Sequence, residues 1–164
     1  MLNNLKRNNR PYQTKFSFGA TSAIITNLGL IVGLDTLARP QLAIISGILI
    51  IALADNIADS FGIHIYQESE YIGKKEVWFS TLTNFFTRIF VSLTFIILVI
   101  ALPLKVAVPC SIIWGLVILA IMSYTIAKDK EVNPYLAIFE HISIAIGVII
   151  ASNFAGKLLI GKFK

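Results

Sequence analysis

The stretch QLAIISGILIIALADNIADSFGIHIY, residues Gln41–Tyr66, decides the class of fold. It is long enough to cross a bilayer as one helix, because a spanning helix needs about 20 mostly apolar residues. Two aspartates, Asp55 and Asp59, interrupt its second half. Ionisable groups inside a span are costly and usually face a bundle interior or a watery path. The stretch therefore predicts a membrane helix that carries a polar site.

The composition of the whole chain also indicates a membrane protein. Of the 164 residues, 56% are hydrophobic and 14% are charged, and the mean hydropathy is +0.78. A soluble domain averages about 45–50% apolar and about 25% charged residues, and a chain of this size has too little interior to hide the excess. The same numbers exclude intrinsic disorder. Cys110 is the single cysteine, which excludes an intramolecular disulfide and a cysteine metal cluster.

Four further segments are long and apolar enough to be spans. We therefore predict an all-α integral membrane protein, a small bundle of five transmembrane helices that dimerises. Residues 1–15 are predicted to be a basic cytoplasmic tail, and residues 16–160 a single transmembrane domain. The predicted spans are Phe16–Leu34, Gln41–Tyr66, Asn84–Leu102, Val106–Ile126 and Pro134–Ala155.

Prolines mark several of the predicted boundaries. Pro103 and Pro109 are expected to bracket the turn between the third and fourth helices. Asn133 supplies an N-cap for the fifth helix and is followed by Pro134 at the first helical position. The longest connection runs from about residue 68 to residue 83 and has room for a helical part.

The distribution of lysine and arginine predicts the orientation. Nine of them lie on the side of the N-terminus and five on the other side, which places the N-terminus in the cytoplasm and the C-terminus outside. The formal net charge is +5. We expect the basic residues to fix the orientation of the chain and to contact anionic lipid rather than to bind nucleic acid. The nine are Lys6, Arg7, Arg10, Lys15, Lys74, Lys75, Arg88, Lys128 and Lys130, and the five are Arg39, Lys105, Lys157, Lys162 and Lys164.

Ionisable side chains within the predicted spans fall at one depth. At about 1.5 Å per residue, Asp55 and Arg88 each lie about 21 Å from the outer surface of a core about 30 Å thick. Glu140 lies about 9 Å from the inner surface, and Ser22 of the first helix comes close to the same level. These positions predict a polar layer in the cytoplasmic third of the membrane.

The two aspartates of this layer are candidate metal ligands. Asp55 and Asp59 are four residues apart, so they project from the same helix face. Two carboxylates this close repel unless one is protonated or a cation bridges them, as a divalent metal or a proton-coupled site requires. Asn56 beside that face can add an oxygen, and Ser22 can assist.

A structural role for the same charges is an open alternative. Arg88 can pair with Asp55 or with Glu140 as a salt bridge that holds the bundle, or Glu140 and Arg88 can serve proton coupling. His64 is not expected to join the aspartates, because it lies about 140° around the helix from the nearer one. It is expected at the cytoplasmic interface instead. His141 points away from the face of Glu140 and is expected to pack or to lie at an interface.

Small residues recur along the first predicted helix at spacings of three and four. Such a stripe allows another backbone to approach closely, which is the usual device for helix association in lipid. Packing within the chain and a dimer seam both remain open. The stripe consists of Gly19, Ser22, Thr26, Gly29 and Gly33, and Ala54, Ala58 and Gly62 repeat the pattern on the second helix.

The stretch Leu53–Glu70 resembles the second helix of the vacuolar iron transporter family, which commonly reads Leu-Ala-Asp-Gly-x-Ser-Met-x-x-Gly-Glu-Tyr-x-x-x-x-Ser-Glu. Phe18-Gly19-Ala20, Ile24-Ile25-Thr26 and Val32-Gly33 are similar to its first helix, and Pro103-Leu104 to its turn between helices three and four. Aligned without a gap, the coinciding residues of the second helix are Leu53, Ala54, Asp55, Gly62, Ser69 and Glu70.

The resemblance implies a homodimeric five-helix carrier that moves ferrous iron, manganese or similar ions out of the cytosol in exchange for protons. The chain departs from the family where Ser22 replaces an aspartate, Asp59 a methionine and Ile63 a glutamate. The family's cytoplasmic metal-binding insertion between helices two and three is absent. Exchanging a thioether for the carboxylate of Asp59 favours harder ions such as Mn²⁺ or Mg²⁺.

We therefore predict a proton-coupled divalent metal ion transporter, with iron or manganese as substrate and no cofactor. Its predicted partners are membrane lipid, the divalent cation and a second copy of the chain, but not nucleic acid. The alternative is a non-transporting membrane scaffold or partner subunit with a structural salt-bridge layer. An enzyme is not predicted, because the sequence contains no Ser/His/Asp order, His-Glu-x-x-His motif or phosphate loop.

Overall fold

The computed structural model describes residues 10–162, so residues 1–9 of the predicted basic tail lie outside the described part. Within this range the chain is almost entirely helical, which confirms the all-α prediction. Residues 10–15, predicted as tail, are the first residues of α2. The helices are α2 (Arg10–Leu34), α3 (Pro40–Ser69), α4 (Lys74–Ala101), α5 (Leu104–Asp129) and α6 (Pro134–Lys162).

Local sequence explains where these helices begin and end. Helix α3 starts with Pro40, whose missing N–H costs nothing at a first position. The residue before a proline is driven to extended backbone, and Leu102 accordingly has φ −118° and ψ 148° before Pro103, which ends α4. The side-chain oxygen of Asn133 accepts a hydrogen bond from the N–H of Tyr135 at 3.0 Å. The predicted N-cap of the last helix is therefore confirmed.

Two sequence-based boundaries are corrected. Helix α4 begins at Lys74, so the long predicted connection shrinks to residues 70–73 and its remainder is helical. Pro109 lies inside α5 rather than at the turn before it, because α5 begins at Leu104. A proline this close to a helix start removes only one backbone hydrogen bond, and neighbouring helices in a membrane bundle tolerate such a loss.

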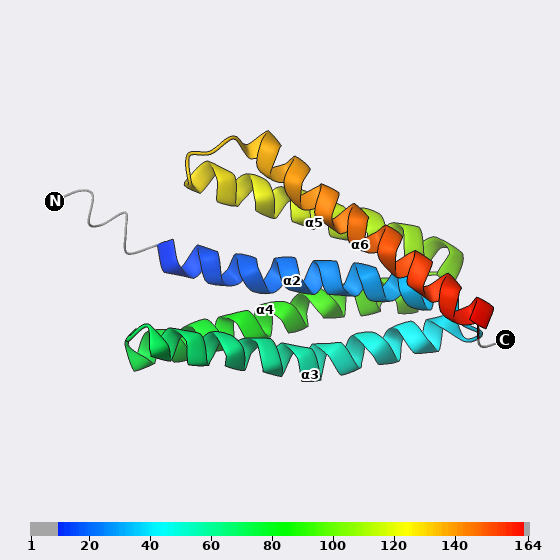
Figure 1. Cartoon of the computed structure of the whole chain (residues 1–164), viewed down its shortest axis with the longest axis horizontal. Helices are drawn as coiled ribbons and strands as arrows, with labels where there is room; N and C mark the ends of the chain where they lie inside the picture. Colours follow the sequence, from blue (N-terminus) through cyan, green and yellow to red (C-terminus); the bar gives the residue numbers. More distant parts are fainter. Residues whose placement is uncertain (1–9, 163–164) are drawn as a thin grey trace.

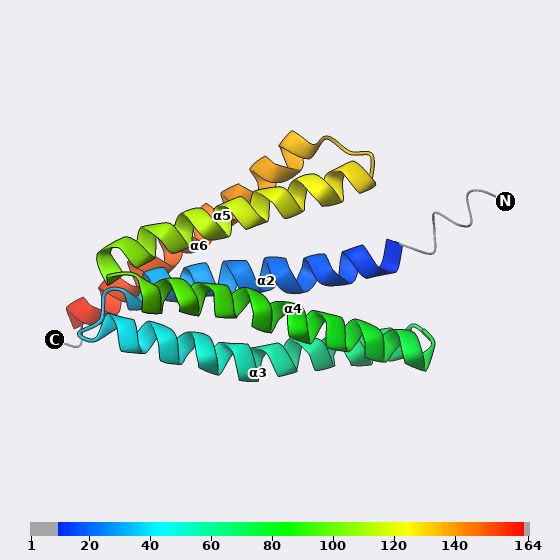
Figure 2. The ribbon, with the colours of Figure 1, turned by 180° about the vertical axis from the view of Figure 1, so that it is seen from behind.

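Helix α2 lies between two hairpins, α3–α4 on one side and α5–α6 on the other (Figure 1). The α5–α6 hairpin is close to α2 near the end of α2 and diverges from it towards the beginning of α2, as the reverse view also shows (Figure 2). The buried apolar core lies where the three parts converge. Its fully buried members are Ile24, Leu28, Ile31, Ile44, Ile48, Phe95, Val99, Leu119 and Ala145.

The small residues of α2 make close contacts within the chain. A Cβ atom on Gly19 would lie 2.5 Å from Oδ1 of Asn84 on α4. On Gly29 it would lie 3.0 Å from Oγ of Ser152 on α6. From the other helix, a Cβ on Gly156 would lie 2.4 Å from the carbonyl oxygen of Gly33. The absent side chains thus let α2 approach both α4 and α6 at backbone distance.

Four of the described helices, α3 to α6, are long and apolar enough to cross a membrane. Helix α2 contributes a shorter apolar segment, Gly19–Leu34, among the residues searched. Large apolar side chains cover the outer faces of α3 and α6, as in Phe61 and Phe154, which are 60% and 66% exposed. Helices that are apolar on their outer faces need an apolar surrounding. The chain is therefore an integral membrane protein.

Candidate functional site

Arg88 of α4 connects three helices near the middle of α2 and α4, next to the buried apolar core. Its Nη1 donates to Oδ2 of Asp59, and its Nη2 donates to Oδ2 of Asp55, both on α3. Nη1 also donates to Oγ of Ser22 on α2 at 2.7 Å. We call these four side chains the Arg88 clasp. It brings together three of the predicted metal ligands with a cation of the protein itself.

The clasp is asymmetric in its exposure. The side chain of Arg88 is 3% exposed, whereas those of Asp55 and Asp59 are 46% and 36% exposed. The guanidinium therefore lies on the inner side and the carboxylates on the open side. Each aspartate is bonded to Arg88 through Oδ2, and Oδ1 of each forms no hydrogen bond with a described side chain.

The charges of the clasp do not cancel when both aspartates are ionised. Asp55 and Asp59 carry two negative charges against the single positive charge of Arg88. The remainder is one negative charge within an apolar bundle, where an uncompensated charge is expensive. One proton on either carboxylate would neutralise it, and a bound cation would also oppose it.

A row of polar side chains continues from the clasp along the contact between α3 and α4. We call it the α3–α4 polar seam. Each side-chain amide of the seam donates one hydrogen bond to a residue of the facing helix. Such bonds matter inside a membrane bundle, because no water is available there to replace the missing partner. The amide of Asn56 donates to the carbonyl oxygen of Phe85 (2.9 Å), that of Asn84 to Ser60 (3.0 Å) and that of Gln67 to Ser80 (2.8 Å).

Asn56, a predicted helper of the metal site, belongs to this seam. It is 1% exposed and turned towards α4, whereas the carboxylates of Asp55 and Asp59 are open. Its Oδ1 atom accepts no hydrogen bond from a described residue. The amide oxygen is therefore an unused acceptor, but it is held by the α4 backbone rather than by the clasp.

Glu140 does not join the polar layer, which corrects the predicted pairing with Arg88. It is exposed on α6, and no ion pair links it to another of the described residues. The reason is tertiary. Helix α6 packs mainly on α2 and α5, and the α5–α6 hairpin diverges from α2 towards the beginning of α2 (Figure 1). Counting residues along α6 gives no information about the direction in which the Glu140 side chain points.

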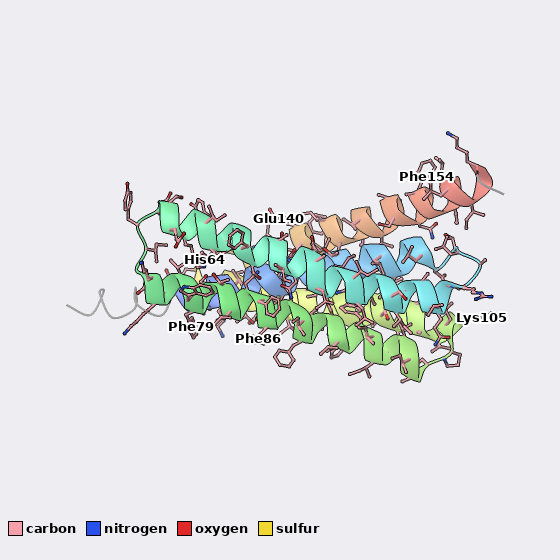
Figure 3. All side chains as sticks on the ribbon, turned by 90° about the horizontal axis from the view of Figure 1, so that it is seen from below. His64, Phe79, Phe86, Lys105, Glu140 and Phe154 are labelled. Carbon is pink, nitrogen blue, oxygen red and sulfur yellow. The ribbon has the colours of Figure 1, made fainter. Side chains whose placement is uncertain are left out.

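The two histidines lie apart from the clasp. Nδ1 of His64 is 3.0 Å from Oγ1 of Thr81 on α4, and its ring packs edge-on against Trp78 with centroids 4.6 Å apart. Figure 3 shows His64 at the α3–α4 contact, with Phe79 and Phe86 on the outer side of α4. His141 lies 2.7 Å from Oγ of Ser123, so it packs between α6 and α5.

Sequence reasoning overlooked the polar seam and the Asn27–Ser92 contact. Nδ2 of Asn27 on α2 donates to Oγ of Ser92 on α4 at 2.9 Å, about one turn from the clasp. A signal was present in the spacing, because polar residues recur on α3 at intervals of three and four from Asn56 to Gln67. Both ends of that series are buried. Such a polar stripe inside an apolar helix predicts a contact with another polar helix face.

Within residues 10–162, no group of three or more His, Cys, Asp or Glu side chains is arranged to bind a metal ion. In the clasp, Arg88 holds the two carboxylates that a metal would use. Comparisons with protein-family models, with curated proteins and with solved structures each found no match to this chain.

Proposed function

We propose that this protein is a divalent metal ion transporter, of iron or manganese, that exports its substrate from the cytosol in exchange for protons. The observation that carries the proposal is the open side of the clasp. Asp55 and Asp59 are held by one buried guanidinium through one oxygen each, and their other oxygens form no hydrogen bond with the side chains of residues 19–162. Carboxylate oxygens are the ligands that hard divalent ions prefer.

In this proposal Arg88 acts as a tethered counter-ion. While no substrate is present, its guanidinium prevents repulsion between the two aspartates. A divalent ion that reaches the open side competes with a proton for the same carboxylates, so binding of one favours release of the other. Ser22 orients the guanidinium by accepting its hydrogen bond. Exposure of the clasp to each side of the membrane in turn would complete a transport cycle.

The proposal includes membership of the vacuolar iron transporter family, a five-span topology and a homodimer. The half-exposed carboxylates support a dimer, because a lipid-facing charge needs cover. Ala54, Ala58 and Gly62 lie on exposed positions of the same helix, and nothing lies within 4 Å of a Cβ placed on Gly62. A second copy could therefore approach α3 closely along this stripe. In this topology the N-terminus is cytoplasmic and the C-terminus is outside.

A second candidate function is a non-transporting scaffold or partner subunit. One observation favours it: Arg88 already bonds both aspartates and Ser22, so the clasp by itself joins α2, α3 and α4. Buried charge networks can fix how helices associate without taking part in chemistry. The two candidates differ in whether the carboxylates ever release Arg88 for another cation.

Metal uptake into vesicles that contain the purified protein tests the transport proposal. Asp55→Asn removes one carboxylate charge while keeping the shape of the side chain, so we expect loss of Mn²⁺ and Fe²⁺ uptake. Asp129→Asn, at the end of α5 and outside the clasp, is the matched control and should transport normally. Equal reconstitution of both variants must be shown by their yield in the vesicles. Undiminished uptake by Asp55→Asn would overturn the proposal.

Thermal unfolding separates transport from the scaffold function. A ligand that binds only the folded protein stabilises it by about 2.7 kcal/mol at one hundred times its dissociation constant. We expect Mn²⁺ to raise the Tm of the wild type but not of Asp59→Ala. A scaffold predicts no metal-dependent change in either protein and no uptake.

A further inference from the structure

A second polar site lies at the C-terminal end of α2, whereas the clasp lies at the middle of that helix. A groove of about 520 Å³ opens between the end of α2, the beginning of α5 and the second half of α6. Apolar side chains form most of its wall, among them Ile112 and Ile149. Its position is about 20 Å along α2 from Ser22, so it is separate from the proposed transport site.

Three polar residues line the same groove: Asp35, Asn153 and Lys157. Among the side chains of residues 19–162, none forms an ion pair or a side-chain hydrogen bond with any of the three. Asp35 and Lys157 thus carry opposite charges beside one cavity without neutralising each other. Opposite charges that are both unsatisfied suit a ligand that itself carries one charge of each sign.

The polar and apolar parts of the groove follow one another along the axis of α6. Asp35 follows the last residue of α2, and Lys157 lies five residues before the end of α6. Ile149 lies two helical turns deeper than Lys157, about 12 Å at the usual rise per residue. Figure 3 shows Phe154, another wall residue, at the same end of the bundle as Lys105 at the beginning of α5. A ligand in this groove would have a polar end at the membrane surface and an apolar end in its core.

We propose that this groove binds one zwitterionic phospholipid with a primary ammonium headgroup, such as phosphatidylethanolamine. Lys157 and Asn153 would bind the phosphate oxygens, because an ammonium and an amide N–H are both donors. Asp35 would accept hydrogen bonds from the ammonium of the headgroup. An acyl chain would cover the apolar wall, including Ile150 and Phe154, which are 65% and 66% exposed.

Lipid titration of the purified full-length protein tests this site. Phosphatidylethanolamine, phosphatidylcholine and phosphatidylglycerol with identical chains are added, and bound lipid is counted by native mass spectrometry alongside the Tm. We expect phosphatidylethanolamine to bind best, since a trimethylated amine cannot donate to Asp35 and a glycerol headgroup has no positive charge. Free phosphoethanolamine, which has no acyl chain, should not raise the Tm.

Two variants and one control assign the effect to the groove. Asp35→Asn should remove the preference for phosphatidylethanolamine over phosphatidylglycerol, and Lys157→Gln should weaken both lipids about three- to fivefold, as expected for a partly exposed ion pair. Lys162→Gln, on the same helix but outside the groove lining, should behave as wild type. Equal binding of all three lipids, or an unchanged preference in Asp35→Asn, would mean annular lipid only and would overturn the proposal. Neither result bears on metal uptake.

Discussion

Arg88 is the central residue of the clasp, because it bonds each of the other three side chains. A guanidinium with 3% exposure in an apolar protein must find its hydrogen-bond partners inside the fold, because neither water nor lipid can supply them. Asp55, Asp59 and Ser22 meet that need from two other helices. The charge that is costly to bury is therefore also the charge that joins α4 to α2 and α3.

Arg88→Met should destabilise the protein by more than the loss of the three hydrogen bonds of Arg88, because it also removes the charge that holds the two aspartates together. The substitution leaves two carboxylates facing each other without a cation, and breaking a buried pair typically costs about 3–5 kcal/mol. Because both aspartates are partly exposed, we expect a loss of about 2 kcal/mol, measured by denaturant unfolding in detergent micelles. Adding Asp55→Asn and Asp59→Asn to Arg88→Met should restore most of the stability. No recovery in the triple variant would show that charge repulsion is not the cause.

At the scale of elements, two helix pairs are held together by different kinds of interaction. The α3–α4 pair has an apolar part around Ile48 and Phe95 and a polar part, the seam that contains Asn84. The α2–α6 pair relies on close backbone approach at Gly33 and Gly156 instead. Amide hydrogen bonds specify one register, while glycines permit a short interhelical distance. The α5–α6 hairpin is thus attached to the bundle mainly at one end.

Gly156→Ala tests the close approach. The added methyl would lie 2.4 Å from the carbonyl oxygen of Gly33, which belongs to a helix backbone and cannot rotate away. Overpacking of this kind costs about 1–3 kcal/mol, so we expect a lower Tm by several degrees. Gly147→Ala is the matched control on the same helix, because nothing lies within 4 Å of its Cβ position. An unchanged Tm for Gly156→Ala would contradict the α2–α6 packing described above.

At the scale of the whole molecule, polarity changes along the bundle axis. The buried apolar core lies where the hairpins converge on α2 (Figures 1 and 2), and the clasp lies next to it, near the middle of α2 and α4. The proposed lipid groove lies at the converging end, beside Lys157. The two proposed sites are therefore separate, because Asp35 of the groove lies about 20 Å beyond Ser22 of the clasp along the axis of α2.

Cysteine labelling tests the orientation of this axis. In a Cys110→Ser background, Lys130→Cys in the α5–α6 turn should react with a membrane-impermeant maleimide only after permeabilisation. Lys162→Cys at the end of α6 should react from outside without it. The reason is the excess of lysine and arginine on the N-terminal side, which favours the cytoplasm. The reverse labelling pattern would invert the predicted topology.

Much of the fold was predictable from the sequence because lipid imposes a simple rule. Spans need about 20 apolar residues, and the ranges ending at Leu34 and beginning at Pro134 agree with the helices found. The start of α4 at Lys74 was missed, since its first turns are amphipathic rather than uniformly apolar. Pro109 was predicted to lie at a turn because proline in a sequence commonly indicates a helix boundary, whereas the structure places it inside α5.

The sequence by itself determined that this chain is a membrane protein and where most of its helices lie, since these depend on composition and on the length of the apolar runs. Only the tertiary structure decided which charges meet. Asp55, Asp59 and Arg88 converge with Ser22, while Glu140 at a similar predicted depth faces outward. The physical reason is rotation. Depth follows from counting along one helix, but a partner depends on how each helix turns about its axis against its neighbours.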